Sequence, residues 1–118
     1  MSISDSTLAL PLLDEARIHR LKMTDGDLTF FVEMIGLFDV RSAELLAEIN
    51  AEAQAGTYRI KPHLHKLKGI CFSLGAQRLA EVCKEMEVLT EKGFVTDNDI
   101  TILQQVTRQT REAQQQLL

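Results

Sequence analysis

The chain has 118 residues, a formal net charge of −4 and 45% hydrophobic residues. This size suits one domain, and the hydrophobic content argues against a disordered chain. The acidic balance argues against general nucleic-acid binding, which requires a dense array of Lys and Arg. Aromatic residues make up only 5%, so the core must consist mainly of Leu, Ile, Val, Met and Ala, a composition that favours helices.

The cysteines and the N-terminus indicate the compartment. Cys71 and Cys83 lie in apolar helical patterns, where a free thiol behaves as a small hydrophobic group. The N-terminal residues lack the basic start of a signal peptide, and no apolar run reaches the length of a membrane span. We therefore expect a whole cytoplasmic protein without a membrane segment.

The first half of the chain predicts two helices. A short one is expected near residues 13–21, and a long one over about 26–55. Apolar residues recur at three- and four-residue steps along the long helix: Leu28, Phe31, Ile35, Phe38, Leu45 and Ile49. Residues 24–27 (Thr-Asp-Gly-Asp) resemble a capping box, and Gly56 stands where a C-terminal cap is expected.

The next helix is expected over about residues 59–74, ended by Gly75. Its apolar stripe is Ile60, Leu64, Leu67, Cys71 and Leu74. Pro62 fits only the first turn of a helix and costs about 3 kcal/mol or more in its interior. The regular helix must therefore either start close to Pro62 or be kinked there.

Two further helices complete the chain. One is expected over about residues 76–92, with Gly93 after it and five residues facing inward: Leu79, Val82, Cys83, Met86 and Leu89. The last starts after the cap-like residues 96–99. It has a polar face rich in Gln and the stripe Ile100, Leu103, Val106, Thr110, Ala113 and Leu117.

Four long amphipathic helices with short connections predict an all-α fold, an antiparallel up-down four-helix bundle with a short extra N-terminal helix. We expect one domain over residues 1–118, with the bundle core at about 25–117. A fold of this kind hosts many activities, so the function must be sought in particular side chains.

The segment His63-Leu64-His65-Lys66-Leu67-Lys68-Gly69 carries the chemical signal. Each helical residue advances about 100°, so His65 lies off the apolar stripe, with Lys68 and Gly69 beside it on the same face. A neutral imidazole is a nucleophile at physiological pH, and a lysine neutralises phosphoryl oxygens. Glycine leaves room for a partner's surface, although packing against a neighbouring helix also explains a mid-helix glycine such as Gly69 or Gly36.

Residues 65–69 (His-Lys-Leu-Lys-Gly), with Gly75-Ala76, Leu79 and Cys83 downstream, resemble the signature of histidine phosphotransfer (HPt) domains. The long helix with three Phe residues is similar to the one that precedes this motif in the family. The resemblance covers about residues 25–117. It implies a four-helix bundle with His65 as the exposed phosphoacceptor, Lys68 as the charge partner and Gly69 as the clearance residue.

The resemblance also implies the reaction and the partners. HPt domains take a phosphoryl group from a receiver-domain aspartate and pass it to another receiver, so the partners expected are the receiver domains of hybrid sensor kinases and response regulators. No cofactor is expected on this chain, since the receiver holds the Mg²⁺. The chain lacks a Gly-rich loop and an acidic metal-binding set for ATP, so we expect a monomeric phosphohistidine carrier rather than a kinase.

Two features depart from the family pattern. Ile70, Cys71 and Phe72 follow Gly69, where small residues such as Ser are common. A polar side chain of the following helix often supports the acceptor imidazole in the family. By spacing, the nearest candidate is Glu87, with Lys84 one turn earlier.

Two other interpretations compete. An interaction module that binds a receiver or regulator without transferring phosphate would keep the same bundle, although it would need no nucleophile. A metal site is disfavoured because His63 points about 200° away from His65 and the cysteine spacing fits no zinc pattern. His19 has no motif around it and is expected at the surface.

Overall fold

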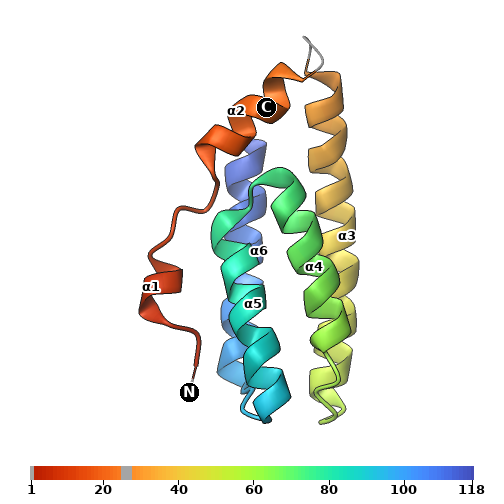
Figure 1. Cartoon of the computed structure of the whole chain (residues 1–118). Coiled ribbons are helices and arrows are strands. Elements are labelled where there is room, and N and C mark those ends of the chain that lie inside the picture. Colours follow the sequence, from red (N-terminus) through yellow and green to blue (C-terminus); the bar gives the residue numbers. More distant parts are fainter. Residues whose placement is uncertain (1, 25–27) are drawn as a thin grey trace.

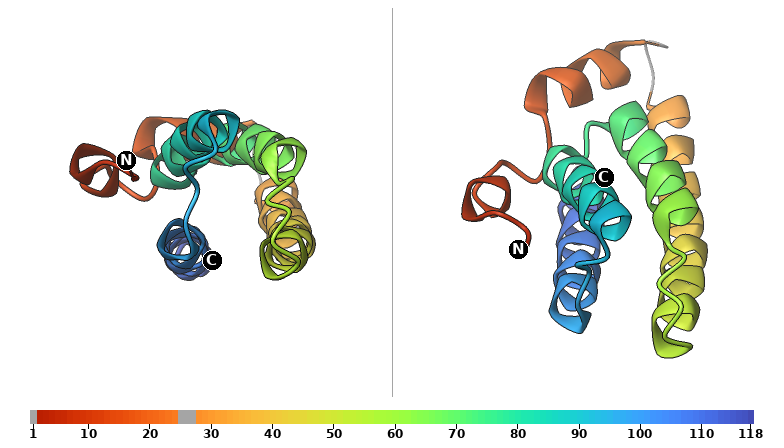
Figure 2. Two further views of the ribbon diagram at one scale, coloured as in Figure 1. Left: turned by 90° about the horizontal axis from the view of Figure 1, so that it is seen from below. Right: turned by 60° about the horizontal axis from the view of Figure 1, so that its bottom comes forward.

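Four long helices pack side by side in the computed structural model, which describes residues 2–24 and 28–118. They are α3 (Thr29–Gln54), α4 (Lys61–Leu74), α5 (Gln77–Lys92) and α6 (Asp97–Gln115), preceded by α1 (Asp5–Leu8) and α2 (Glu15–Met23). Seen from the end, the long helices follow one another around the bundle in chain order (Figure 2). The described ranges contain no strand, and the predicted antiparallel four-helix bundle is confirmed.

The helix boundaries follow from caps that the sequence encodes. Helix α4 begins at Lys61, so Pro62 lies in its first turn. Of the two alternatives predicted for Pro62, the structure thus shows a helix that starts close to the proline. Gly75 and Gly93 end α4 and α5 in left-handed conformations, with φ of 67° and 74°, which glycine adopts without steric cost. Thr96 and Asp99 form a reciprocal capping box at the start of α6.

The apolar stripe of α3 forms one wall of the core. Phe31, Ile35, Phe38 and Ile49 are at most 1% exposed. The expectation for Leu28 was wrong: it precedes the helix at the N-cap position and is 48% exposed. The capping sequence expected at residues 24–27 lies largely outside the described residues, and α3 begins only at Thr29.

The core face of α6 is wider than the predicted stripe. Ile100, Leu103, Val106 and Thr110 are buried as expected. The prediction that the Gln residues of this helix form its polar face was only partly right, because Gln114 is fully buried. Neither of its amide atoms has a hydrogen-bond partner within the described residues. Gln114 follows Thr110 by four residues, which places it on the same inward face.

The N-terminal segment contains two helices instead of the one expected near residues 13–21. Residues 2–14, here called the N-terminal arm, run along α5 and include α1, whose N-cap is Ser4. One turn of helix is too short for a periodic pattern to reveal it. After the arm, α2 lies across the end of the bundle, where the Asp14 amide donates to the Gly75 carbonyl at 2.8 Å.

Cys71 of α4 and Cys83 of α5 are free thiols, each 0% exposed. A hydrogen bond with Cys71, followed by burial, raises the pKa of the Cys83 thiol well above its ordinary value. Both thiols thus act as core groups, as the sequence predicted. None of the described helices is long and apolar enough to cross a membrane.

The raised pKa of Cys83 makes stability depend on pH. Below the ordinary thiol pKa of about 8.5, folded and unfolded chains both keep the proton. Above that pH the unfolded chain releases the proton while the folded chain holds it, so the free energy of unfolding falls by up to about 1.4 kcal/mol per pH unit. Urea unfolding at increasing pH should show this slope in the wild type and a smaller one in Cys83→Ala. Equal slopes in the two proteins would contradict this role of Cys83.

Candidate functional site

Helix α4 turns His65 toward solvent because its opposite face is fixed in the core. Leu64, Leu67 and Cys71 are 0% exposed, whereas the His65 side chain is 71% exposed. The position predicted from helical geometry is confirmed, and the ring stands where a partner's surface can reach it.

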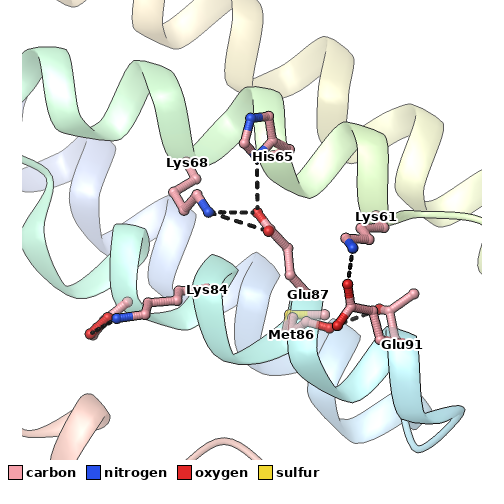
Figure 3. A network of polar contacts seen from close by, with 9 residues as sticks. Lys61, His65, Lys68, Lys84, Met86, Glu87 and Glu91 are labelled. Carbon is pink, nitrogen blue, oxygen red and sulfur yellow. Dashed lines mark hydrogen bonds and ion pairs between the residues drawn. The ribbon is translucent and has the colours of Figure 1, made fainter.

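Glu87 of α5 lies directly against this ring. Its Oε1 atom is 3.7 Å from Nδ1 of His65, just beyond hydrogen-bonding distance. The other ring nitrogen, Nε2, points away from Glu87 (Figure 3). The sequence offered both Glu87 and Lys84 as supports for the imidazole, and the structure brings only Glu87 to it. Lys84 is directed elsewhere and pairs with Glu81 at 3.8 Å.

The same carboxylate holds Lys68. Its Nζ is 3.1 Å from Oε1 of Glu87 and donates a hydrogen bond to Oε2 at 3.2 Å. Both side chains are mostly buried, at 20% and 13% exposure, so solvent screens this pair less than one at the open surface. Lys68 is near His65 as expected, but in this state its charge is matched by Glu87. Spacing alone could not show that one carboxylate would serve both residues.

Another lysine of α4 is paired in the same way. Lys61 contacts Glu91, one turn along α5 from Glu87 (Figure 3). This hydrogen bond and the lysine charge lower the pKa of the Glu91 carboxyl. Lys61 and Lys68 are therefore both balanced by acidic residues of α5 and do not form an open cationic patch.

Gly69 faces open space beside His65. A Cβ atom built there would meet no atom within 4 Å, apart from its own helix and chain neighbours. Close helix packing therefore does not explain this glycine. Gly36 in α3 also faces open space, so close packing does not explain that glycine either.

The other histidines lie apart from His65. Nδ1 of His63 is 2.8 Å from a carboxylate oxygen of Glu48 in α3, on the flank of α4 away from α5. His19 is exposed, as expected. Across residues 2–24 and 28–118, no group of three or more His, Cys, Asp or Glu side chains is placed to bind a metal ion.

The three residues after Gly69 divide between core and surface. Cys71 is buried and Ile70 packs against the core, whereas Phe72 is 63% exposed. Two hollows flank α4 here, one of about 440 Å³ toward α5 and one of about 280 Å³ toward α3. The bulky residues that depart from the family pattern thus give this end of the His65 face an apolar character.

The all-helical bundle with an exposed His65 on α4 has the arrangement that the resemblance to histidine phosphotransfer domains implied. The Hpt domain family model matches residues 33–117. The chain therefore belongs to the Hpt domain family, whose members act in histidine phosphotransfer in phosphorelays.

A solved structure has a similar fold. It is an X-ray structure described as a histidine-containing phosphotransfer protein from rice, with 23% sequence identity and a TM-score of 0.63. The match covers 94% of this chain and 87% of that one. No match was found among curated proteins.

The position of Glu87 predicts the tautomer of His65. We expect the carboxylate to hold the proton on Nδ1 and leave Nε2 unprotonated, because only Nδ1 faces an acceptor. Two-bond ¹H–¹⁵N correlation spectra of the imidazole measure this directly. Glu87→Gln retains an acceptor oxygen and should keep the bias, whereas Glu87→Ala should lose it. Glu91→Gln, one turn away, serves as a matched control, and an unchanged tautomer in Glu87→Ala would contradict the assignment.

Proposed function

We propose that this chain is a phosphorelay carrier in which Nε2 of His65 accepts a phosphoryl group from a receiver-domain aspartate and passes it to another receiver. The observation that carries the proposal is the exposed imidazole, which has Nδ1 against Glu87 and Nε2 free of the protein. An imidazole held in this way presents its nucleophilic lone pair outward.

In the proposed step, the Nε2 lone pair attacks phosphorus, a P–N bond forms, and the P–O bond to the aspartate breaks. The receiver regains its carboxylate, and the positive charge on the ring lies next to Glu87. Onward transfer reverses these changes on a second receiver. This exchange depends on positioning and charge stabilisation, and the Mg²⁺ belongs to the receiver.

Lys68 is the proposed charge partner of the phosphoryl group. To contact the phosphoryl group, Nζ of Lys68 must leave the two Glu87 oxygens, at 3.1 and 3.2 Å, and bind phosphoryl oxygens instead. The arriving group carries more negative charge than one carboxylate, which favours the exchange. Glu87 is then released from Lys68 when the ring beside it becomes positive.

Exposed apolar side chains on α3 and α4 favour docking of a partner on this face. Leu37 and Phe72 are 68% and 63% exposed, and transient signalling contacts are commonly small. We propose a monomeric carrier that meets receivers of hybrid kinases and response regulators here. The two free thiols fit a reducing compartment such as the cytoplasm.

The carrier function is tested by mixing the protein with a receiver domain charged with acetyl phosphate and Mg²⁺. Wild type should gain an acid-labile, alkali-stable label, and His65→Gln should gain none. His63→Gln is the matched control and should be labelled like the wild type. A wild type that binds receivers but gains no label would instead be a non-transferring interaction module.

Gly69 should prove necessary for the approach of the receiver, not for folding. Replacing it by Gln should stabilise the free protein by about 0.5–1 kcal/mol, because glycine is unfavourable within a helix and nothing lies within 4 Å. Transfer from a receiver should slow by about tenfold or more, since a clash at the reacting atoms disturbs their alignment.

Gly36→Gln is the matched control for Gly69→Gln, because Gly36 is another uncovered glycine within a helix. It should give a similar gain in stability without slowing transfer. Stopped-flow transfer rates and urea unfolding measure the two effects. Equal transfer rates in both variants would contradict the clearance role of Gly69.

A further inference from the structure

The N-terminal arm is fixed along the side of α5 by specific polar contacts. The Ser4 amide and hydroxyl donate to the two carboxylate oxygens of Glu85 at 3.2 and 2.7 Å. Farther along the arm, Nε of Arg78 donates to the Leu10 carbonyl at 2.7 Å. These contacts hold the arm against α5 at two points, Ser4 and Leu10, so the arm is an ordered part of the surface.

Two hollows separate the arm from the bundle. The first, of about 440 Å³, lies between the arm and the end of α4, with Leu10, Phe72, Ala80 and Lys84 among its lining residues. The second, of about 330 Å³, lies between the start of the arm and α5, and Lys84 lines it as well. The first hollow combines apolar walls with a rim of charged side chains, an arrangement suited to an apolar side chain of a protein partner.

Lys84 connects these hollows to the His65 site. It precedes Glu87, the residue that contacts His65, by one helical turn (Figure 3). A transient signalling interface buries up to about 600 Å² on each partner, which corresponds to a radius of roughly 14 Å for a circular footprint. Packed helices lie about 8–10 Å apart. A partner centred on His65 therefore covers α5 as far as Lys84. Phe72 follows His65 by seven residues, about 10 Å along the same face of α4, and it lines the first hollow together with Leu10 of the arm. A partner that covers Phe72 thus meets the edge of the hollow that the arm closes.

We propose that the N-terminal arm is a specificity-determining wall of the receiver-docking surface, and that the first hollow takes an apolar side chain of the receiver. The proposal rests on the phosphocarrier function above. The family model begins at residue 33, so the arm lies outside the part of the chain that it matches. A wall supplied by the arm gives this chain a means of selecting among receivers that share the same phosphotransfer chemistry.

Leu10 and Leu12 provide a matched pair of variants. Both are partly buried residues of the arm, but Leu10 lines the first hollow. Leu12 lines a different one, beside α2 and the end of α6. Leu10→Asp and Leu12→Asp make the same chemical change two residues apart, and circular dichroism and urea unfolding establish that each variant is folded.

The experiment compares receiver-dependent and receiver-independent labelling of His65. Transfer is measured against the concentration of receiver domains encoded by the same genome, each charged with acetyl phosphate and Mg²⁺. Phosphoramidate, which phosphorylates histidine without a protein partner, reports the chemistry alone. Leu10→Asp should raise the receiver concentration at half-maximal rate by about tenfold for at least one receiver, with phosphoramidate labelling unchanged. Leu12→Asp should match the wild type in both assays.

The outcomes separate the arm from the carrier function. If receivers label Leu10→Asp as readily as the wild type, or if Leu12→Asp loses as much as Leu10→Asp, the arm is no specificity wall and the carrier function stands. If no receiver labels the wild type while phosphoramidate does, the carrier function fails, and the arm proposal fails with it.

Discussion

The packing of α4 against α5 determines how the candidate phosphotransfer site is built. Leu64, Leu67 and Cys71 point into the bundle and leave no exposed area, so the opposite side of α4 must carry His65. Because α5 returns antiparallel beside α4, its polar border places Glu87 within reach of both His65 and Lys68. A rotation of α4 that buried His65 would also expose the leucines, and their hydrophobic cost fixes the orientation.

Glu87 gives this site a different charge balance from a histidine beside a free lysine. One carboxylate, 13% exposed, faces a cation on one side and a ring nitrogen on the other. Leaving either Lys68 or Glu87 unpaired in this mostly buried position would be costly, so each holds the other when no phosphoryl group is present. In the proposed transfer, the phosphoryl group is a second anion for Lys68, and the ring beside Glu87 becomes positive. The resting ion pair is then replaced by two new ones, so that neither Lys68 nor Glu87 loses its partner in the proposed step.

The sequence predicted the features that repeat along a helix or follow from a strong local cap. The stripes of α3 and α4, the position of Pro62 and the glycine stops are such features, and the outward direction of His65 follows from the same periodicity. Features that depend on contacts between neighbouring helices were harder to predict from the sequence. Spacing offered Glu87 and Lys84 together, and only packing separated them. The burial of Gln114 and the exposure of Leu28 depend on where α6 and α3 meet the bundle, and the single turn of α1 leaves no periodic trace.

The N-terminal arm shows why a shared motif and a shared fold leave partner choice open. In the proposed transfer, the chemistry is confined to His65 and its motif neighbours, and a receiver that approaches that ring meets the outward face of α4. Discrimination must therefore come from the border of the face. On the α5 side that border is the arm, held by Ser4 and Arg78. Since these anchors lie on the far side of α5 from His65, the arm can vary without disturbing Glu87 or Lys68. The two proposals together thus assign selection of a receiver and transfer of phosphate to different parts of one surface.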